Sequence, residues 1–254
     1  MHSRHVKFVH LSFAFFLVFC SAPSVAAEEL RVLVPRAIAS VLGNIGAQFE
    51  RATGCKLIVT SDDAAGLVRR ANSGESFDVI AVTPAQIDSL IKDGKIVADT
   101  RTRLMRSGIG VEVRAGAPKP DVSSVDAFKR ALLSAKSIGY LKGGLSGPYV
   151  AALLDRLGIA EAIKSKVIRP ETDIVSLLVA KGEVEIGMVV ITQIMTTPGV
   201  EFVGPLPSEI QSYISLVGGV ATNSHAPDTA HELIKFLTGP VAAPAIKAQG
   251  MEQG

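Results

Sequence analysis

The feature that most constrains the fold is a strand, a tight turn and a helix encoded one after another from residue 30. Residues 30–34 form a short apolar run without helical period, and Pro35 cannot continue a strand inside a sheet. Apolar residues then recur every three or four positions over residues 38–49, and Gly54 is a typical helix stop. We therefore predict a buried strand, a turn at residues 35–37 and an amphipathic helix.

A second unit of the same kind follows. The apolar run 57–59 is followed by Asp62 and Asp63 and then by a helical pattern that begins at Ala64. A carboxylate at a helix start accepts backbone N–H groups and complements the helix dipole. We interpret the two acids as caps and keep contact with a ligand as the alternative.

A third unit completes the series. Residues 77–82 predict a strand, Thr83 suits a helix cap, Pro84 suits the first helical position and Gly94 ends the helix. Three successive units of strand and helix predict a parallel sheet with right-handed crossovers.

The regularity breaks after the third unit. Residues 107–114 alternate like a strand and lead into a proline-rich segment, so we place a boundary between two lobes near residue 108. Residues 137–140 predict a further strand, which a glycine-rich loop over residues 141–147 joins to a helix over residues 148–157.

The end of the chain is expected to return to the first lobe, because residues 211–222 predict a long strand and two helical segments follow it. We therefore expect an α/β fold of two lobes, each a mostly parallel sheet flanked by helices, with lobe two inserted into lobe one. Lobe one is expected to cover residues 28–108 and 211–254, and lobe two residues 109–210.

The N-terminal segment has the pattern of a secretory signal. Arg4 and Lys7 are its only charges, an apolar run over residues 11–20 is too short to span a bilayer, and small residues fill positions 22–27. We therefore predict a signal peptide over residues 1–27 and a periplasmic location.

A lipoprotein cleavage box before Cys20 is the alternative. Phe19 is too large for the position before the cysteine, so we do not expect lipid anchoring. Without the signal, Cys55 is the one cysteine, and its apolar neighbours indicate a buried structural thiol.

Charge and histidine content exclude several classes of function. The 26 basic residues less Arg4 and Lys7 equal the 24 acidic ones, so nothing indicates nucleic acid or an anionic membrane as a partner. His225 and His231 are six positions apart, which is not the spacing of metal ligands on a helix. We expect a monomer without a metal or cofactor.

The first candidate site residues lie where predicted parallel strands end and helices begin, the usual ligand position in open α/β sheets. These are Arg36 and Ala37 in the first unit and Asp63 and Ala64 in the second. The guanidinium of Arg36 is suited to grip a carboxylate or oxyanion. A solvated arginine explains the residue equally well.

The second group of candidates lies in lobe two. Ser146 and Gly147 stand at the start of a predicted helix after a glycine-rich loop, and Tyr149 is the one aromatic residue in a candidate loop. We favour contact with a ligand here over a plain turn in which Ser146 serves as a cap.

Ser146 also allows an enzymatic alternative. Residues 144–147, Gly-Leu-Ser-Gly, approach a nucleophile elbow, but Pro148 stands where that pattern needs a second glycine. A secreted hydrolase that uses Ser146 is therefore the less favoured interpretation.

The order of these elements resembles a known family. A secretion signal, LRVLV before a helix that contains QFERATG, the FDVIA strand with its proline-opened helix, and the ending AHELIKFLTGPVAAPAIKAQGM over residues 230–251 are similar to the molybdate-binding-protein-like periplasmic substrate-binding proteins of ABC importers. The resemblance implies a type II periplasmic binding protein whose two lobes close over a small anion, with the membrane permease of an ABC importer as partner.

The resemblance also indicates which positions differ. The family's molybdate binders carry a serine in each of the first two turns, where this chain has Pro-Arg-Ala at residues 35–37 and Asp-Asp-Ala at residues 62–64. The family's lobe-two tyrosine corresponds to Val190 or Ile191. A hydroxyl cage suits a tetrahedral oxyanion, whereas an arginine fork suits a planar carboxylate.

We therefore expect an extracytoplasmic receptor for an organic carboxylate rather than for molybdate, and not an enzyme. The alternatives are a receptor for molybdate, tungstate or another inorganic oxyanion, and a sensor partner that presents its ligand to a membrane receptor.

Overall fold

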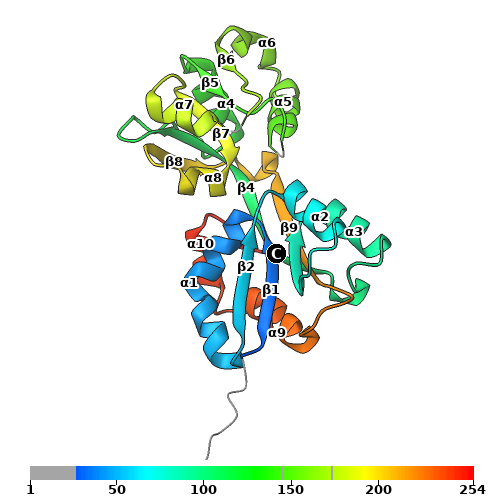
Figure 1. Ribbon diagram of the computed structural model, residues 1–254. Coiled ribbons are helices and arrows are strands. Elements are labelled where there is room, and N and C mark those ends of the chain that lie inside the picture. Colours follow the sequence, from blue (N-terminus) through cyan, green and yellow to red (C-terminus); the bar gives the residue numbers. More distant parts are fainter. Residues whose placement is uncertain (1–26, 145, 173) are drawn as a thin grey trace, which may run out of the picture.

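The computed structural model describes residues 27–144, 146–172 and 174–254, and its ribbon forms two lobes joined at a narrow crossing (Figure 1). The expected signal peptide and Cys20 lie outside the described residues, apart from Ala27 at the end of that segment. In the described part of the chain, no helix combines the length and the hydrophobicity that a membrane span needs.

Lobe one is built from both ends of the described chain. Its elements are β1 (Glu29–Val34), α1 (Arg36–Thr53), β2 (Lys56–Ser61), α2 (Ala64–Asn72), β3 (Val79–Val82), α3 (Pro84–Lys92), η1 (Ala98–Thr100), β9 (Tyr213–Val220), α9 (Pro227–Thr238), α10 (Ala243–Ala248) and β10 (Glu252–Gln253).

Lobe two is built from the middle of the chain. Its elements are α4 (Val125–Ser134), β5 (Ile138–Gly139), α5 (Gly147–Arg156), α6 (Ala160–Ile163), η2 (Lys164–Lys166), β6 (Val167–Ile168), α7 (Val175–Lys181), β7 (Ile186–Val190), α8 (Ile191–Thr196), β8 (Val200–Pro205) and η3 (Ser208–Ile210). The long strand β4 (Thr102–Arg114) belongs to both lobes.

The strand directions bring the carboxyl-end edges of the two sheets face to face. In lobe one, β2, β1 and β3 are parallel, β9 is antiparallel to β3, and β4 is antiparallel to β9. In lobe two, β6, β5 and β7 are parallel, and β7 and β8 are each antiparallel to β4. Because β4 runs from lobe one into lobe two, the carboxyl ends of β1 to β3 point toward lobe two and those of β5 and β7 point back.

The two-lobed α/β architecture predicted from the sequence is confirmed, with one refinement. The strands that carry the predicted units are parallel, but β4, β8 and β9 make the sheets mixed. Helices cover both faces of each sheet (Figure 1). In lobe one, the buried clusters centre on Phe49 on one face and on Leu67 on the other, and in lobe two the core centres on Phe128.

The crossing between the lobes is defined by strand register. Gly108 of β4 pairs with Tyr213 of lobe one, and the next residue, Ile109, pairs with Val190 of lobe two. The strand starts at Thr102, five residues before the predicted start. A register irregularity between Arg103 and Met105 breaks the alternation of buried and exposed residues. This part of the strand therefore lacks the alternating apolar pattern from which a strand is predicted.

Three further expectations need correction. Helix α1 begins at Arg36, so the turn is shorter than residues 35–37 and Ala37 is helical. Apolar residues that recur at helical spacing from Val125 predict that Leu133 faces the core, but in α4 this residue is 44% exposed. Strand β8 was not predicted, because its residues are only partly buried and pair with the end of β4 rather than with a neighbour in sequence. Cys55 is buried, as expected.

Candidate functional site

The start of α1 presents unsatisfied backbone donors at the edge of lobe one. The residue before the helix, Pro35, has no side-chain acceptor for the first N–H groups of α1, which have no partner within a helix. Arg36 is exposed, and its guanidinium makes no hydrogen bond or ion pair with any described residue. This helix start therefore offers backbone amides and one free cation to an anion.

The start of α2 is satisfied by its own side chains. Asp63 caps the helix by accepting a 2.6 Å hydrogen bond from the Gly66 N–H, so the predicted capping role is confirmed for this residue. Asp62 accepts from the Asp63 N–H at 2.8 Å and pairs with Arg70 at 3.3 Å. The Asp63 N–H and then Arg70 hold the pKa of Asp62 below its usual value. Contact of Asp63 and Ala64 with a ligand stays a prediction.

The start of α3 also carries side-chain hydrogen bonds, between Gln86 and the preceding Thr83. The Gln86 side-chain oxygen accepts from the Thr83 N–H at 3.2 Å and from the Thr83 hydroxyl at 2.7 Å. Among the three lobe-one helices that follow parallel strands in the described chain, α1 is thus the one without a side chain at its start.

The start of α5 is its counterpart in lobe two. Ser146 precedes the helix but makes no capping bond, is 1% exposed, and has a hydroxyl without a hydrogen-bond partner among the described residues. A buried hydroxyl that stays unpaired costs about 1 to 3 kcal/mol. Such a group beside a helix start is therefore best explained by a ligand that supplies the missing partner.

Gly147 allows the chain to fold tightly at this point. A Cβ atom on this residue would lie 2.2 Å from the Leu141 carbonyl oxygen, well inside van der Waals contact. The glycine therefore lets the loop from Leu141 pack directly against the first turn of α5. That close packing buries Ser146.

Tyr149 contacts the segment that returns to lobe one. Its hydroxyl donates a 2.7 Å hydrogen bond to the Ile210 carbonyl, and the Arg156 guanidinium lies 5.6 Å from its ring centre. The hydroxyl is therefore engaged inside the protein. Contact of this side chain with a ligand stays a prediction.

Val190 and Ile191 lie at the crossing. Val190 pairs with Ile109, and Ile191 lies so close to Gly110 and Gly250 that a Cβ on these glycines would approach it to 2.8 Å and 2.6 Å. Ile191 thus packs between a strand of lobe two and the C-terminal turn of lobe one. Their contact with a ligand also stays a prediction.

Two cations of lobe two were not predicted. Lys142 pairs with Glu171 at 2.5 Å, and the Arg169 guanidinium lies 5.0 Å from the ring centre of Tyr140. Burial raises the pKa of Tyr140, and Arg169 opposes the rise. Tyr140 and Arg169 directly follow the parallel strands β5 and β6. Arg36 was selected because it directly follows a parallel strand, and the same criterion selects Tyr140 and Arg169. Arg169 was missed because the two-residue strand β6 was not recognised in the sequence.

The crossing also carries a polar residue that the sequence did not single out. The Gln211 side chain accepts from the Ile109 N–H at 2.9 Å and donates to the Ile109 carbonyl at 3.0 Å. It lines a cavity of about 180 Å³ together with Ile191 and Gly250. One side chain thus bonds the two segments that connect the lobes, in addition to the strand pairing of Gly108 with Tyr213.

The hydrolase alternative lacks its base in this structure. The His225 N–H donates to Asp78 at 2.9 Å, and the His231 ring nitrogen lies 2.6 Å from the Pro227 carbonyl, both at the α9 side of lobe one. Neither ring lies within hydrogen-bond distance of Ser146. Within the described ranges, no group of three or more metal-ligating side chains is placed to hold a metal ion.

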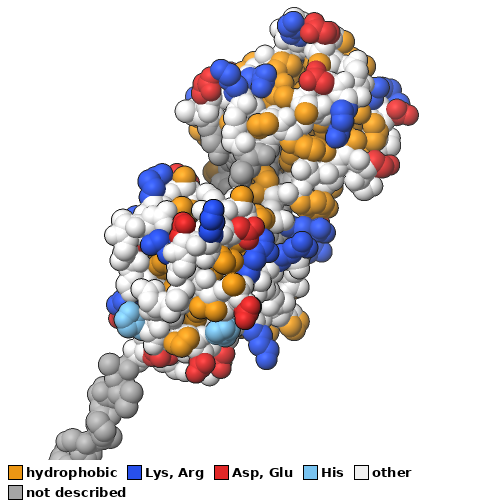
Figure 2. Space-filling model, turned by 90° about the vertical axis from the view of Figure 1, so that its right-hand side faces the viewer, with side chains coloured by type: hydrophobic (Ala, Val, Ile, Leu, Met, Phe, Trp, Pro, Cys, Tyr) orange, Lys and Arg blue, Asp and Glu red, His pale blue; other side chains and the backbone are white. Residues whose placement is uncertain are grey.

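The predicted residues therefore form two sets on facing edges. Arg36, Ala37, Asp63 and Ala64 lie on the edge of lobe one, and the remaining five lie on the edge of lobe two or at the crossing. The molecular surface narrows between these edges (Figure 2). Of these positions, the starts of α1 and α5 combine backbone donors with side chains, Arg36 and Ser146, that have no hydrogen-bond partner within residues 27–144, 146–172 and 174–254.

Comparison with known proteins identifies relatives along nearly the whole chain. An aconitate isomerase from a Pseudomonas species is 30% identical over 245 residues, which is 93% of each protein. The molybdate-binding protein ModA of Azotobacter vinelandii is 27% identical over 241 residues, or 92% of each. A substrate-binding domain assigned to a molybdenum ABC transporter of Clostridium difficile superposes with a TM-score of 0.78 at 18% identity, covering 90% of this chain and 100% of that one.

These relatives correct one expectation. A relative that is 30% identical over 93% of the chain bears the name of an enzyme, so the expectation of a protein that is not an enzyme is wrong.

The resemblance to ModA-like binding proteins is confirmed. The relatives support a substrate-binding protein of the ABC-transporter type, and the family model for bacterial extracellular solute-binding proteins matches residues 30–252. The chain therefore belongs to the bacterial extracellular solute-binding protein family.

Proposed function

We propose that this protein binds a small organic polycarboxylate between its lobes and interconverts the isomers of an acid of the aconitate type. Isomerisation and delivery of a solute to an ABC permease both require that the acid is bound. A turnover measurement separates these two roles. The single observation that carries the proposal is the buried hydroxyl of Ser146 at the start of α5, which has no hydrogen-bond partner among the described residues and lies on the edge that faces the uncapped start of α1.

The charges on the two edges favour a planar carboxylate. Arg36 in lobe one makes no hydrogen bond or ion pair with a described residue, and Arg169 in lobe two makes no ion pair with one. A guanidinium donates two parallel hydrogen bonds to a carboxylate, which a hydroxyl cannot do. The name of the aconitate isomerase relative points to the same class of ligand, since aconitate is a tricarboxylate.

The binding energy requires both edges. A helix start contributes about 0.3 to 1 kcal/mol toward an anion, and a charged hydrogen bond about 1.5 to 3 kcal/mol. Micromolar affinity corresponds to about 8 kcal/mol. One edge with one arginine falls short of this value, so we infer that donors from both lobes act together.

The proposed reaction is balanced within one molecule. A proton leaves the methylene carbon next to one carboxylate, the double bond shifts, and a proton returns to the carbon at its former far end. No co-reactant is consumed. Carboxylates held by cations make the methylene proton more acidic, because the negative charge that develops is stabilised.

The test is proton NMR of the purified protein mixed with cis-aconitate or trans-aconitate. We expect the two samples to converge on the same mixture of isomers, and Arg36→Gln to slow the convergence at least tenfold. Unchanged spectra from both isomers would rule out the isomerase. If calorimetry then still detects binding of either acid, the delivery role remains.

An inorganic oxyanion is the second candidate, because the ModA relative is 27% identical and is named for molybdate binding. A melting-shift panel of molybdate, tungstate, sulfate and aconitate separates the two ligand classes. We expect the largest shift with aconitate. A larger shift with molybdate would favour the oxyanion.

A further inference from the structure

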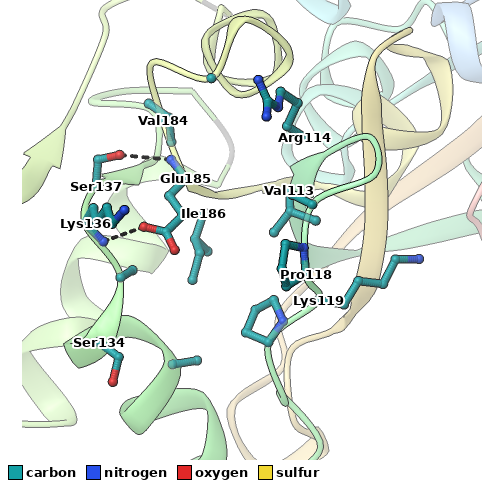
Figure 3. Close-up of a pocket in the computed structure, with 15 residues that line it drawn as sticks. Val113, Arg114, Pro118, Lys119, Ser134, Lys136, Ser137, Val184, Glu185 and Ile186 are labelled. Atoms are coloured by element: carbon teal, nitrogen blue, oxygen red, sulfur yellow. Dashed lines mark hydrogen bonds between the residues drawn. The ribbon is translucent and has the colours of Figure 1, made fainter.

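A cavity of about 620 Å³ lies in lobe two, away from the facing edges described above (Figure 3). Three segments line it: the end of β4 with the turn after it, the connection from α4 to β5, and the turn from α7 to β7. The amino ends of β5 and β7 point away from lobe one, since their carboxyl ends face it. This cavity is therefore separate from the space between the lobes.

The inner surface of the cavity is apolar. Val113, Val184 and Ile186 are at most 3% exposed, and Ala135 is 5% exposed. Figure 3 shows Val113 and Pro118 on one wall and Ile186 on the other. Because these four side chains are already shielded from water, the apolar surface open to a ligand comes from the more exposed lining residues Ala117, Pro118 and Ala131. Burying it contributes about 25 cal/mol per Å² of apolar surface removed from water.

The rim of the cavity is cationic. The side chains of Arg114 and Lys136 make no hydrogen bond or ion pair with a described residue, whereas Lys119 pairs with Glu201 at 3.2 Å. The one acid in the lining, Glu185, accepts from the Lys136 backbone N–H at 2.5 Å. The lining thus holds three cations against the one carboxylate of Glu185, and of these cations Arg114 and Lys136 have no acidic partner among the described residues.

Arg114 is accommodated by a glycine. Gly182 has φ +80°, and a Cβ there would lie 3.3 Å from the Arg114 Nη1 atom. The close-up shows the guanidinium of Arg114 beside the turn from α7 to β7 (Figure 3). A larger residue at position 182 would be strained and would press on this side chain. The turn therefore leaves the guanidinium room at the cavity mouth.

We propose that this cavity binds a small amphiphilic monocarboxylate, with its apolar body against Ala117, Pro118 and Ala131 and its carboxylate beside Arg114 and Lys136. The apolar part of the lining favours a ligand with one carboxylate over the polycarboxylates proposed for the space between the lobes, because each further carboxylate adds a desolvation cost.

The probe is anilinonaphthalene sulfonate, an apolar anion whose fluorescence rises in apolar surroundings, added to the purified full chain. We expect saturable binding that octanoate displaces and the neutral octanol displaces at least fivefold less well. The double variant R114Q/K136Q is expected to bind the dye at least fivefold more weakly. K181Q is the matched control, because it removes an exposed cation of the same lobe outside the cavity, and it is expected to bind as the unmodified protein does.

A second variant tests the position of the dye. Ala131 is half-buried and lines the cavity, so A131F is expected to fill part of it and to reduce dye binding while circular dichroism reports an unchanged fold. Arg36→Gln is expected to leave dye binding unchanged. Unchanged dye affinity in R114Q/K136Q, or equal displacement by octanoate and octanol, would overturn the proposal without touching the proposed function between the lobes.

Discussion

Ser146 and Gly147 are neighbours with opposite effects on stability. Gly147 allows a close backbone approach to Leu141, which favours a compact loop. The Ser146 hydroxyl is buried and has no hydrogen-bond partner in the part of the chain that the structure describes, which disfavours the unliganded fold. Local destabilisation of this kind is concentrated at sites where a ligand supplies the missing interaction.

Gly147→Ala tests the close approach. We expect a loss of about 1 to 3 kcal/mol in the free energy of unfolding, because the new Cβ forces the loop away from α5. Gly143→Ala is the matched control in the same loop, since no atom lies within 4 Å of its added Cβ. Urea unfolding followed by circular dichroism measures both variants. Equal stability of the two would contradict the packing described here.

Tyr140 offers a test by pH. Burial raises its pKa above the usual value of a tyrosine, so we expect it to ionise in a late phase of an alkaline titration followed by phenolate absorbance. Its contribution to stability is present below pH ~10 and is lost as the pH rises through the folded-state pKa. Tyr140→Phe should remove this late phase. A late phase that persists in this variant would refute the assignment.

The sequence located the residues that act locally but not those engaged by distant parts of the chain. The Asp63 cap follows from its own helix start, and that part was predictable. The bond from Tyr149 to Ile210 joins residues 61 positions apart, and Ile191 meets Gly250 from the other end of the chain. No local pattern contains these contacts. The site residues as a set stay a prediction.

At the level of elements, β4 and the segment before β9 form the connection between the lobes. Gln211 joins them through two hydrogen bonds with the Ile109 backbone, and a Cβ on Gly108 would lie 2.9 Å from the Gln211 amide nitrogen. A glycine in β4 and a glutamine before β9 therefore fit together where the lobes separate. Any relative motion of the lobes bends the chain at this point.

Gln211→Ala is expected to loosen this connection. It leaves the Ile109 N–H without its side-chain acceptor, at a cost of about 1 to 3 kcal/mol. Hydrogen exchange of the Ile109 amide should become at least tenfold faster than in the unmodified protein. Gln211→Glu keeps an acceptor for this N–H, so its exchange rate at Ile109 is expected to lie between those of the unmodified protein and Gln211→Ala. Unchanged exchange in Gln211→Ala would show that the side chain does not hold the crossing.

Element prediction succeeded where strands alternate with helices. The first three units have clear apolar runs, helix starts and glycine stops, and the structure contains all three. Prediction failed at β8 and at the first residues of β4. Both strands are stabilised by antiparallel pairing with distant segments, and an irregular register blurs the pattern in β4.

On the scale of the whole molecule, the strand directions explain how both lobes reach the proposed ligand. Strand β4 passes through both sheets, so the parallel strands of the lobes point at each other and the helices that follow them begin on the facing edges. The sequence predicted this arrangement through its repeated units and its resemblance to a family. The partner of each helix start was not predictable, because that depends on whether a side chain such as Asp63 or Gln86 turns back to cap it.

The most direct test of the account is a calorimetric titration of trans-aconitate into the unmodified protein and three single variants. Arg36→Gln and Ser146→Ala remove one donor from each lobe, and each should weaken binding about tenfold, which corresponds to about 1.4 kcal/mol. Arg51→Gln removes the same charge from the far end of α1 and should leave the affinity unchanged. If either donor variant bound trans-aconitate as tightly as the unmodified protein, the ligand would not be held between the two lobes.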